Sequence, residues 1–223
     1  MNEASMELVH DKECVITKGN IIYTFIKRTF DFIMSFVSII LLSPLFLLLI
    51  ILVKIDSKGK AIFKHKRIGK DGKYIYLYKF RTMYSNSDEM LKELLKDPKI
   101  KKEWEANYKL SNDPRITKVG KFLRKSSLDE LPQLFNILVG DMSFVGPRPL
   151  VDKEIDKYGK DKETLLSVIP GLTGWWACNG RSCTSYEDRI KLELYYVKNR
   201  SIKLDIKVLF KSFITVIKRT GAK

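Results

Sequence analysis

The run FIMSFVSIILLSPLFLLLIILV, residues 32–53, decides the fold, because it contains no charged side chain. A helix needs about 20 predominantly apolar residues to cross the hydrocarbon core of a bilayer. Uncharged runs of this length are typical of membrane helices and uncommon in the cores of soluble domains. The run therefore predicts a segment embedded in a membrane.

Two features of this run leave its path through the membrane open. Ser43-Pro44 lies near the middle, where proline removes a backbone hydrogen bond and bends a helix. Basic residues flank both ends, and the positive-inside rule places such flanks in the cytoplasm. These features favour a helix–break–helix that returns to the face it entered, but a single-pass helix with a tolerated kink fits equally well. Lys27 and Asp31, spaced i,i+4, are expected to pair where the chain meets the membrane.

A second stretch, Ser126-Ser127-Leu128-Asp129-Glu130-Leu131-Pro132, places two adjacent carboxylates in a basic chain. Ser127 and Glu130 have the spacing of a capping box, which predicts a helix from here through Leu138. Asp129 as the N-cap, with Pro132 in the first turn, is the alternative start. In both cases the acids lie near a helix N-terminus, where N–H groups and the helix dipole favour anions. Taken locally, the acids are either ordinary capping residues or an ionised pair beside a phosphate.

Residues 61–82 predict a β-hairpin, because turn residues at 69–72 precede a strand rich in aromatic side chains. With a two-residue period, Tyr74, Tyr76, Tyr78 and Phe80 share one face, and Lys79 and Arg81 share the other. A basic pair on a rigid strand suits phosphate binding, although an exposed strand face explains it as well.

Further helices are predicted on either side of the acidic pair. Residues 86–108 predict a charged surface helix broken at Asp97-Pro98. Thr184-x-x-Glu187 is a capping box for a helix from about Tyr186 to Lys198. Residues 204–218 are basic and amphipathic, which predicts a helix lying in the membrane interface or packed on the core.

The net charge is +15, from 41 Lys and Arg against 26 Asp and Glu. Such a charge predicts an anionic partner: nucleic acid, anionic lipid or a phosphorylated substrate. The three cysteines, Cys14, Cys178 and Cys183, form no zinc-binding pattern, and their odd number argues against a disulfide framework. We expect free thiols in a reducing compartment.

Several arginines on predicted turns and strands suit a substrate that carries two or more phosphates. The candidate phosphate-binding residues are Arg67, Lys79, Arg81, Arg115, Arg124, Arg148 and Arg181. A carboxylate pair among them suits Mg²⁺ bound to phosphate oxygens, or a nucleophile toward phosphorus. The sequence has no Walker loop and no GxGxxG, which disfavours ordinary ATPases and dehydrogenases. These residues predict phosphoryl-type transfer at a membrane surface; a membrane-tethered nucleic-acid binder and a non-catalytic scaffold are the alternatives.

A series of ordered motifs runs from about Lys27 to the C-terminus. The motifs are Lys27-Arg28 with Asp31, Leu42–Leu45, Lys66–Gly69, Tyr78–Met83, Asp113–Thr117, Leu123–Gln133, Gly140–Ser143 and Val145–Pro149. In this order they resemble the bacterial sugar transferases, or monotopic phosphoglycosyl transferases, which start glycan assembly on polyprenol phosphate.

The resemblance implies an α+β protein with a membrane-embedded re-entrant helix broken at Ser43 and Pro44. It also implies a mostly helical cytoplasmic catalytic domain, a small β-hairpin and amphipathic interfacial helices. The expected organisation is a lead-in at 1–24, the membrane helix at 25–57 and the phosphoglycosyl transferase domain at 58–223. That domain is expected on the cytoplasmic face of the bacterial inner membrane.

The resemblance also implies the reaction. Asp129 is expected to attack the β-phosphate of a UDP-sugar, releasing UMP and leaving a phosphosugar–aspartate that polyprenol phosphate then attacks. Glu130 matches the second position of the acidic dyad and is interpreted as a Mg²⁺ ligand or acid–base helper. Arg124 and Arg148 match positions associated with phosphate or nucleotide binding.

The expected partners are a UDP-sugar, polyprenol (undecaprenyl) phosphate and anionic bilayer lipids, with Mg²⁺ as cofactor. No nucleic-acid partner is expected, and a homodimer is a further option. The expected pathways are exopolysaccharide, capsule, O-antigen or glycoprotein glycan assembly. The tail resembles the branch that acts on hexose-1-phosphates such as galactose or glucose. It departs from that branch at Trp175-Trp176-Ala177-Cys178, where a Gln often follows the aromatic residue, and this departure bears on sugar identity.

Overall fold

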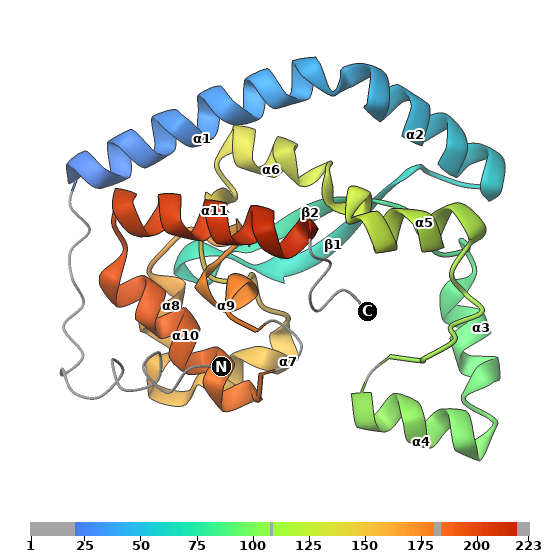
Figure 1. Ribbon diagram of the computed structural model, residues 1–223. Coiled ribbons are helices and arrows are strands. Elements are labelled where there is room, and N and C mark those ends of the chain that lie inside the picture. The colour runs from blue at the N-terminus through green and yellow to red at the C-terminus, as the bar shows by residue number, and fades with distance from the viewer. Residues whose placement is uncertain (1–20, 108, 181–183, 218–223) are drawn as a thin grey trace. The chain divides into compact units, whose positions relative to one another are not determined.

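The computed structural model describes residues 21–107, 109–180 and 184–217 (Figure 1). The lead-in at residues 1–20, Cys14, Arg181, Cys183 and Lys218 lie outside this described part. The chain divides into two compact units, each taken by itself below. Unit 1 contains the chain up to Ile39, Lys66–Leu77 and the chain from Gln133; unit 2 contains Ile40–His65 and Tyr78–Pro132.

The apolar run forms two helices, α1 (Ile21–Leu41) and α2 (Ser43–Asp56), separated at Leu42. Pro44 lies in the first turn of α2, where a backbone N–H has no partner within the helix and its loss is tolerated. The two helices are bent by 63° at the break. Within the described residues no single helix is long and apolar enough to cross a membrane, and α1 with α2 meets that test only as a pair. The predicted helix break is therefore confirmed, while the path through a membrane stays a prediction.

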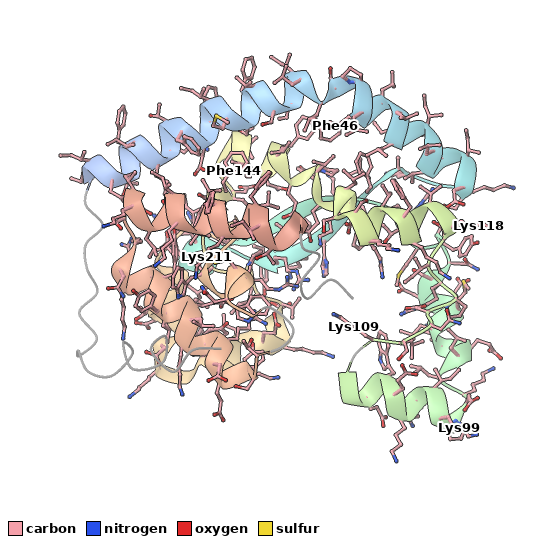
Figure 2. The ribbon with its side chains drawn as sticks, viewed as in Figure 1. Phe46, Lys99, Lys109, Lys118, Phe144 and Lys211 are labelled. Carbon is pink, nitrogen blue, oxygen red and sulfur yellow. The ribbon has the colours of Figure 1, made fainter. Side chains whose placement is uncertain are left out.

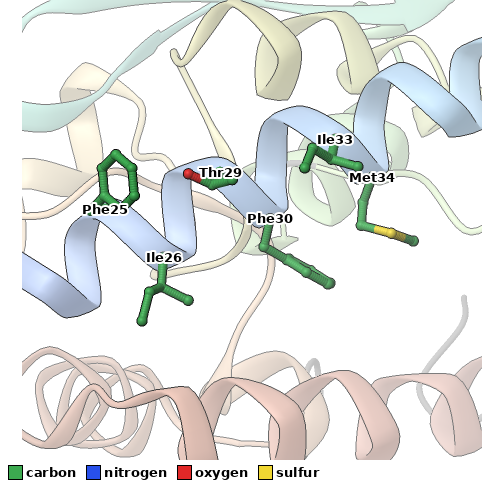
Figure 3. A pocket seen from close by; sticks show the side chains of 6 residues that line it. All are labelled: Phe25, Ile26, Thr29, Phe30, Ile33 and Met34. Atoms are coloured by element: carbon green, nitrogen blue, oxygen red, sulfur yellow. The ribbon is translucent and has the colours of Figure 1, made fainter.

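The surface of α1 is strongly apolar. An open hollow runs along it, and Figure 3 shows the side chains that line it: Phe25, Ile26, Thr29, Phe30, Ile33 and Met34. Phe25 is 71% exposed and Ile33 is 51% exposed. Contiguous exposed apolar surface on a protein marks an interaction site or a membrane contact. A helix that faces lipid would present such a surface.

Three charged side chains at the start of α1 attach it to the rest of unit 1. Lys27 Nζ donates to Asp205 on α11 (Ile202–Ile217) at 2.8 Å, and not to Asp31 as predicted. Asp31 accepts the backbone N–H of Phe144 at 3.1 Å instead. Arg28 donates to the carbonyls of Ile137 and Leu138, at 2.6 and 2.7 Å, near the end of α6 (Gln133–Val139). The i,i+4 spacing indicated a local pair, but partners from distant parts of the chain are better placed.

The core of unit 1 surrounds a small parallel sheet of β3 (Ser143–Val145) and β4 (Gly171–Thr173), in which Ser143 pairs with Gly171. α10 (Tyr186–Asn199) and α11 contribute buried residues such as Tyr196 and Val208 to this core. Shorter helices complete the unit: α7 (Asp152–Ile155), η5 (Asp156–Asp161), α8 (Lys162–Leu166) and α9 (Trp175–Cys178). The N-cap of α10 is Ser185, whose Oγ accepts the N–H of Asp188 at 3.1 Å. The predicted capping box is therefore one residue out of register.

α11 carries two different faces. Val208 is fully buried in the core, whereas Ile206, Phe210 and Phe213 are each more than 60% exposed. Lys211, labelled in Figure 2, lies with its Nζ 4.9 Å from the Trp175 ring. The buried face confirms packing on the core. The exposed apolar residues next to lysines agree with the interfacial alternative, which stays a prediction.

Unit 2 contains the end of the broken helix pair and the acidic stretch. β1 (Ile62–Ile68) and β2 (Tyr74–Phe80) form the predicted two-stranded sheet around the turn η3 (Lys70–Gly72). Unit 2 contains this hairpin only up to His65 and from Tyr78, and the rest of it belongs to unit 1. Phe80 is buried and its ring centroid lies 5.8 Å from that of Phe46 on α2. Tyr74 and Tyr76, predicted to share a face with Phe80, are more than half exposed.

The remaining elements of unit 2 are α3 (Ser87–Leu94), α4 (Pro98–Asn107), α5 (Lys118–Ser126) and η4 (Leu128–Glu130). The predicted break of the charged helix at Asp97-Pro98 is thus confirmed. With two small sheets among many helices in its described part, the chain belongs to the mixed class that the sequence predicted.

Candidate active site

The acidic pair lies in a tight turn rather than at the start of a long helix. α5 ends at Ser127, which adopts a left-handed conformation with φ 57°. The single 3₁₀ turn η4 follows, and the side chain of Ser127, its N-cap residue, makes no capping hydrogen bond. An N-cap residue requires extended backbone angles, which a left-handed Ser127 does not have. Both predicted helix starts are therefore wrong, because α6 begins only at Gln133.

Lys79, predicted to bind phosphate, contacts the acidic pair directly. Its Nζ donates to Oε1 of Glu130 at 2.7 Å, and the two side chains are 23% and 33% exposed. Burial raises the pKa of Asp129, and the neighbouring charge of Glu130 raises that pKa further. Lys79 and Arg124 oppose this shift through their positive charges. The site therefore holds two repelling carboxylates and two cations that moderate the repulsion.

Arg124 reaches the same site from α5. Its Nε donates to Oγ1 of Thr82, just beyond β2, at 2.8 Å. Burial lowers the pKa of Arg124, while the charges of Asp129 and Asp113 raise it. Arg124 is thus held by one fixed hydrogen bond and lies within the electrostatic range of Asp129.

Two other predicted phosphate-binding residues of unit 2 are engaged elsewhere. Arg115 forms a buried bidentate pair with Asp113, with Nε and Nη2 at 2.8 and 2.7 Å from the two carboxylate oxygens. Arg81 donates to the backbone carbonyls of Val53, Ser57 and Lys58 at the end of α2. These contacts engage the carboxylate-facing donors of Arg115 and both Nη groups of Arg81, although Nε of Arg81 is buried without a hydrogen-bond partner in the described part of the chain. We therefore leave Arg81 and Arg115 out of the substrate site proposed below.

The remaining predicted residues belong to unit 1. Arg67 Nη1 lies 4.0 Å from Glu154. The side chain of Arg148 is exposed, with its Cζ 6.0 Å from the ring of Trp176. Its backbone N–H donates to the carboxylate of Glu193 at 3.4 Å. Arg181 lies outside the described residues.

A buried ionic network beneath Arg148 was missed at the sequence level. Arg189 pairs with Glu154 at 3.0 Å and with Glu193 at 3.4 Å, and the hydroxyl of Tyr158 also donates to Glu193. Burial raises the pKa of Glu193, although Arg189 and the hydrogen bonds oppose this. The i,i+4 spacing of Arg189 and Glu193 on α10 was the available signal. The network fixes the backbone that carries Arg148.

These features define a class of protein. A half-buried carboxylate pair between two cations, in a chain with a broken apolar helix pair, suits chemistry on a phosphorylated substrate close to lipid. Comparison with known families is specific: residues 22–219 match the family described as "Bacterial sugar transferase". The chain belongs to this family of enzymes, as its motifs predicted.

The named relatives extend the comparison. The chain is 50% identical over 199 residues to the undecaprenyl-phosphate galactose phosphotransferase of Salmonella typhimurium, covering 89% of this chain and 42% of that protein. It is 45% identical over 197 residues to the exopolysaccharide production protein ExoY of Sinorhizobium fredii, covering 88% and 87%. It is 36% identical to the UDP-glucose:undecaprenyl-phosphate glucose-1-phosphate transferase of Escherichia coli, covering 86% and 40%. The chain thus spans less than half of the first and third relatives and most of the second.

Proposed function

We propose that this protein transfers a sugar-1-phosphate from a UDP-sugar to undecaprenyl phosphate and releases UMP. The observation that carries the proposal is the pair Asp129 and Glu130 set between Lys79 and Arg124. Relatives named for the transfer of galactose or glucose phosphate to undecaprenyl phosphate, and for exopolysaccharide production, support the substrate class and the pathway.

In the first step a carboxylate oxygen of Asp129 attacks the β-phosphorus of the UDP-sugar. The bond from that phosphorus to the bridging oxygen breaks, and UMP leaves with the electron pair. The product is an acyl phosphate that joins Asp129 to the sugar phosphate. Asp129 must be ionised to attack, and the positive charges of Lys79 and Arg124 favour that form. The same cations stabilise the negative charge that develops on the phosphoryl oxygens.

In the second step a phosphate oxygen of undecaprenyl phosphate attacks the phosphorus of the acyl phosphate. The Asp129 carboxylate leaves, and the product is undecaprenyl diphosphate-sugar. Each bond formed is matched by one broken at the same phosphorus, so Asp129 is regenerated. We assign Glu130 a supporting role, through its charge or as an acid–base group, and its ion pair with Lys79 supports this.

The donor set fits Mg²⁺, which usually binds one or two carboxylates together with substrate phosphates. Asp129 and Glu130 are close enough for one charge to raise the pKa of the other, and a divalent cation relieves such repulsion. The described residues contain no group of three or more acidic, His or Cys side chains, so a closed protein cage is not formed there. We propose that Glu130 would hold Mg²⁺ beside Asp129, where the ion would bind substrate phosphate. When bound, the ion neutralises phosphate charge.

The membrane setting follows from the acceptor. We propose that α1 and α2 form a re-entrant pair in the inner membrane, with the acidic pair on the cytoplasmic side. The apolar surface of α1 and the exposed Phe210 and Phe213 of α11 support this arrangement. Lysines beside them suit anionic lipids.

The test is UMP release by the purified protein in lipid nanodiscs, measured over a panel of UDP-sugars. With the preferred donor and no lipid acceptor, we expect a burst of about one UMP per enzyme. Asp129→Asn should abolish the burst and keep membrane association, whereas Asp141→Asn, which changes an exposed acid of unit 1, should leave it intact. UMP release that strictly requires undecaprenyl phosphate would refute the covalent intermediate. Activity of the Asp129→Asn variant near that of the wild type would refute the nucleophile.

A further inference from the structure

The last turn of α2 bonds directly to the first turn of α5. Oδ2 of Asp56, the final residue of α2, accepts the backbone N–H of Val119 at 2.9 Å. The first N–H groups of a helix have no partner within the helix and depend on such acceptors. Oγ1 of Thr117, the N-cap of α5, accepts the N–H of Gly120 at 3.0 Å. Asp56 is therefore a second cap of α5, supplied by the apolar helix pair.

Arg81 holds the same end of α2. Its Nη1 donates to the carbonyl of Lys58 at 2.8 Å, and its Nη2 donates to those of Ser57 and Val53 at 2.6 and 3.3 Å. Gly59 makes room for this contact, because a Cβ there would lie 2.3 Å from Nη1 of Arg81. One side chain thus binds three backbone carbonyls in the last turn of α2 and just beyond it.

The next residue, Thr82, holds α5 at two points. Its carbonyl accepts the N–H of Thr117 at 3.1 Å, and its Oγ1 accepts Nε of Arg124 at 2.8 Å. Gly120 packs so closely that a Cβ would lie 2.1 Å from the carbonyl oxygen of Thr82. The dipeptide Arg81-Thr82 therefore connects the end of α2 to both ends of α5.

We infer that Asp56 is a positioning residue that aligns Asp129 and Glu130 with the membrane helix α2 by fixing α5. This inference rests on the proposed function. α5 ends at Ser126, and only Ser127 and Leu128 separate it from Asp129. Ser127 is held left-handed by backbone bonds from its N–H to the carbonyls of Arg124 and Leu123. Because this connection is short and held by hydrogen bonds, a displacement of α5 also displaces the acidic pair.

The inference predicts a change in the chemical step without a change in donor affinity. Asp56→Ala removes the acceptor, and a displacement of about 1 Å can lower a rate by up to 100-fold. We expect kcat for UMP release in nanodiscs to fall about 10- to 100-fold, with KM for the UDP-sugar within about threefold of the wild type. Asp56→Asn keeps an oxygen acceptor, so it should restore most of kcat. Asp56→Glu keeps the charge but lengthens the side chain, so it should give an intermediate kcat.

A matched control is Asp97→Ala. Asp97 also caps a helix, since its Oδ1 accepts the N–H of Lys99 at 2.8 Å in the first turn of α4, which does not lead into the acidic pair. This variant should lower the melting temperature and leave kcat unchanged. The inference is overturned if Asp56→Ala folds and has the kcat of the wild type, or if it loses no more activity than Asp97→Ala. Should Asp56→Ala fail to fold, an Asp56→Glu variant with the kcat of the wild type overturns it equally. A wild-type protein that releases no UMP would refute the proposed function and not the positioning argument.

Discussion

Asp113→Ala is predicted to destabilise unit 2 strongly without weakening substrate binding. In the structure the side chains of Asp113 and Arg115 are each 6% exposed, and three donors of Arg115 reach Asp113. The guanidinium also lies 5.0 Å from the ring of Trp104. Removing the carboxylate leaves a buried, uncompensated positive charge. The loss of one partner from such a pair costs about 3–5 kcal/mol.

That magnitude is large enough to measure. For a chain of this size, each 1 kcal/mol shifts the melting temperature by about 2–4 °C, so the expected loss is about 6–20 °C. The double variant Asp113→Leu with Arg115→Met removes both charges and should recover much of it. Glu103→Ala, which removes exposed hydrogen bonds to Ser111, should change the melting temperature little.

The same pair predicts a pH dependence. Burial alone would raise the pKa of Asp113, but the hydrogen bonds and charge of Arg115 outweigh it and hold that pKa below its usual range. The carboxylate therefore contributes its full stability above the unfolded value of about 3.9 and loses it as the pH falls through the lowered folded pKa. Thermal unfolding in nanodiscs from pH 7 to 3 should show this loss in the wild type and much less of it in the double variant. This reasoning would be refuted if Asp113→Ala kept the melting temperature of the wild type and raised KM for the UDP-sugar tenfold or more. Arg115 would then be assigned to the substrate site.

Three further outcomes can be checked separately. Lys79→Met removes the 2.7 Å contact to Glu130 and a cation beside the reacting phosphate, so kcat for UMP release should fall about tenfold or more. An unchanged kcat would contradict the proposed role of Lys79 in the site. Gly59→Ala places a Cβ against Arg81 at φ 120°, which should cost about 1–3 kcal/mol in a denaturation experiment, and a neutral result would contradict the Arg81 contact. A fluorophore attached at Phe210→Cys, with the other cysteines replaced, should be quenched by lipid-linked nitroxide, whereas emission as in water would contradict an interfacial α11.

Patterns with a strong physical period could be predicted from the sequence. The apolar run, its break at Ser43-Pro44, the hairpin and the amphipathic α11 all appear where the sequence placed them. Their side-chain periods and turn residues leave few alternatives.

What the sequence did not predict depends on long-range contacts. Asp129 and Glu130 were expected at a helix start, but the left-handed Ser127 that prevents this is not visible in residue types. The sequence does not distinguish Arg81 and Arg115 from the other arginines. Only the fold shows that Arg81 binds carbonyls at the end of α2 and that Arg115 pairs with Asp113. Lys79 was expected to bind phosphate, whereas in the structure it contacts Glu130, 51 positions further along the chain. Local propensity carries no information on such partners.

The contacts of α1 also bear on how the protein is made. Arg28, Asp31 and Lys27 find their partners 109, 113 and 178 residues further along the chain. A ribosome adds about 5–20 residues per second, so these charges remain unmatched for about 5 to 36 seconds while the partner segments are synthesised. In the membrane setting proposed above, the apolar run would reach the bilayer during that interval, before the partners of its charged start exist. The contacts between α1 and the rest of unit 1 therefore cannot be complete until α11 has been synthesised.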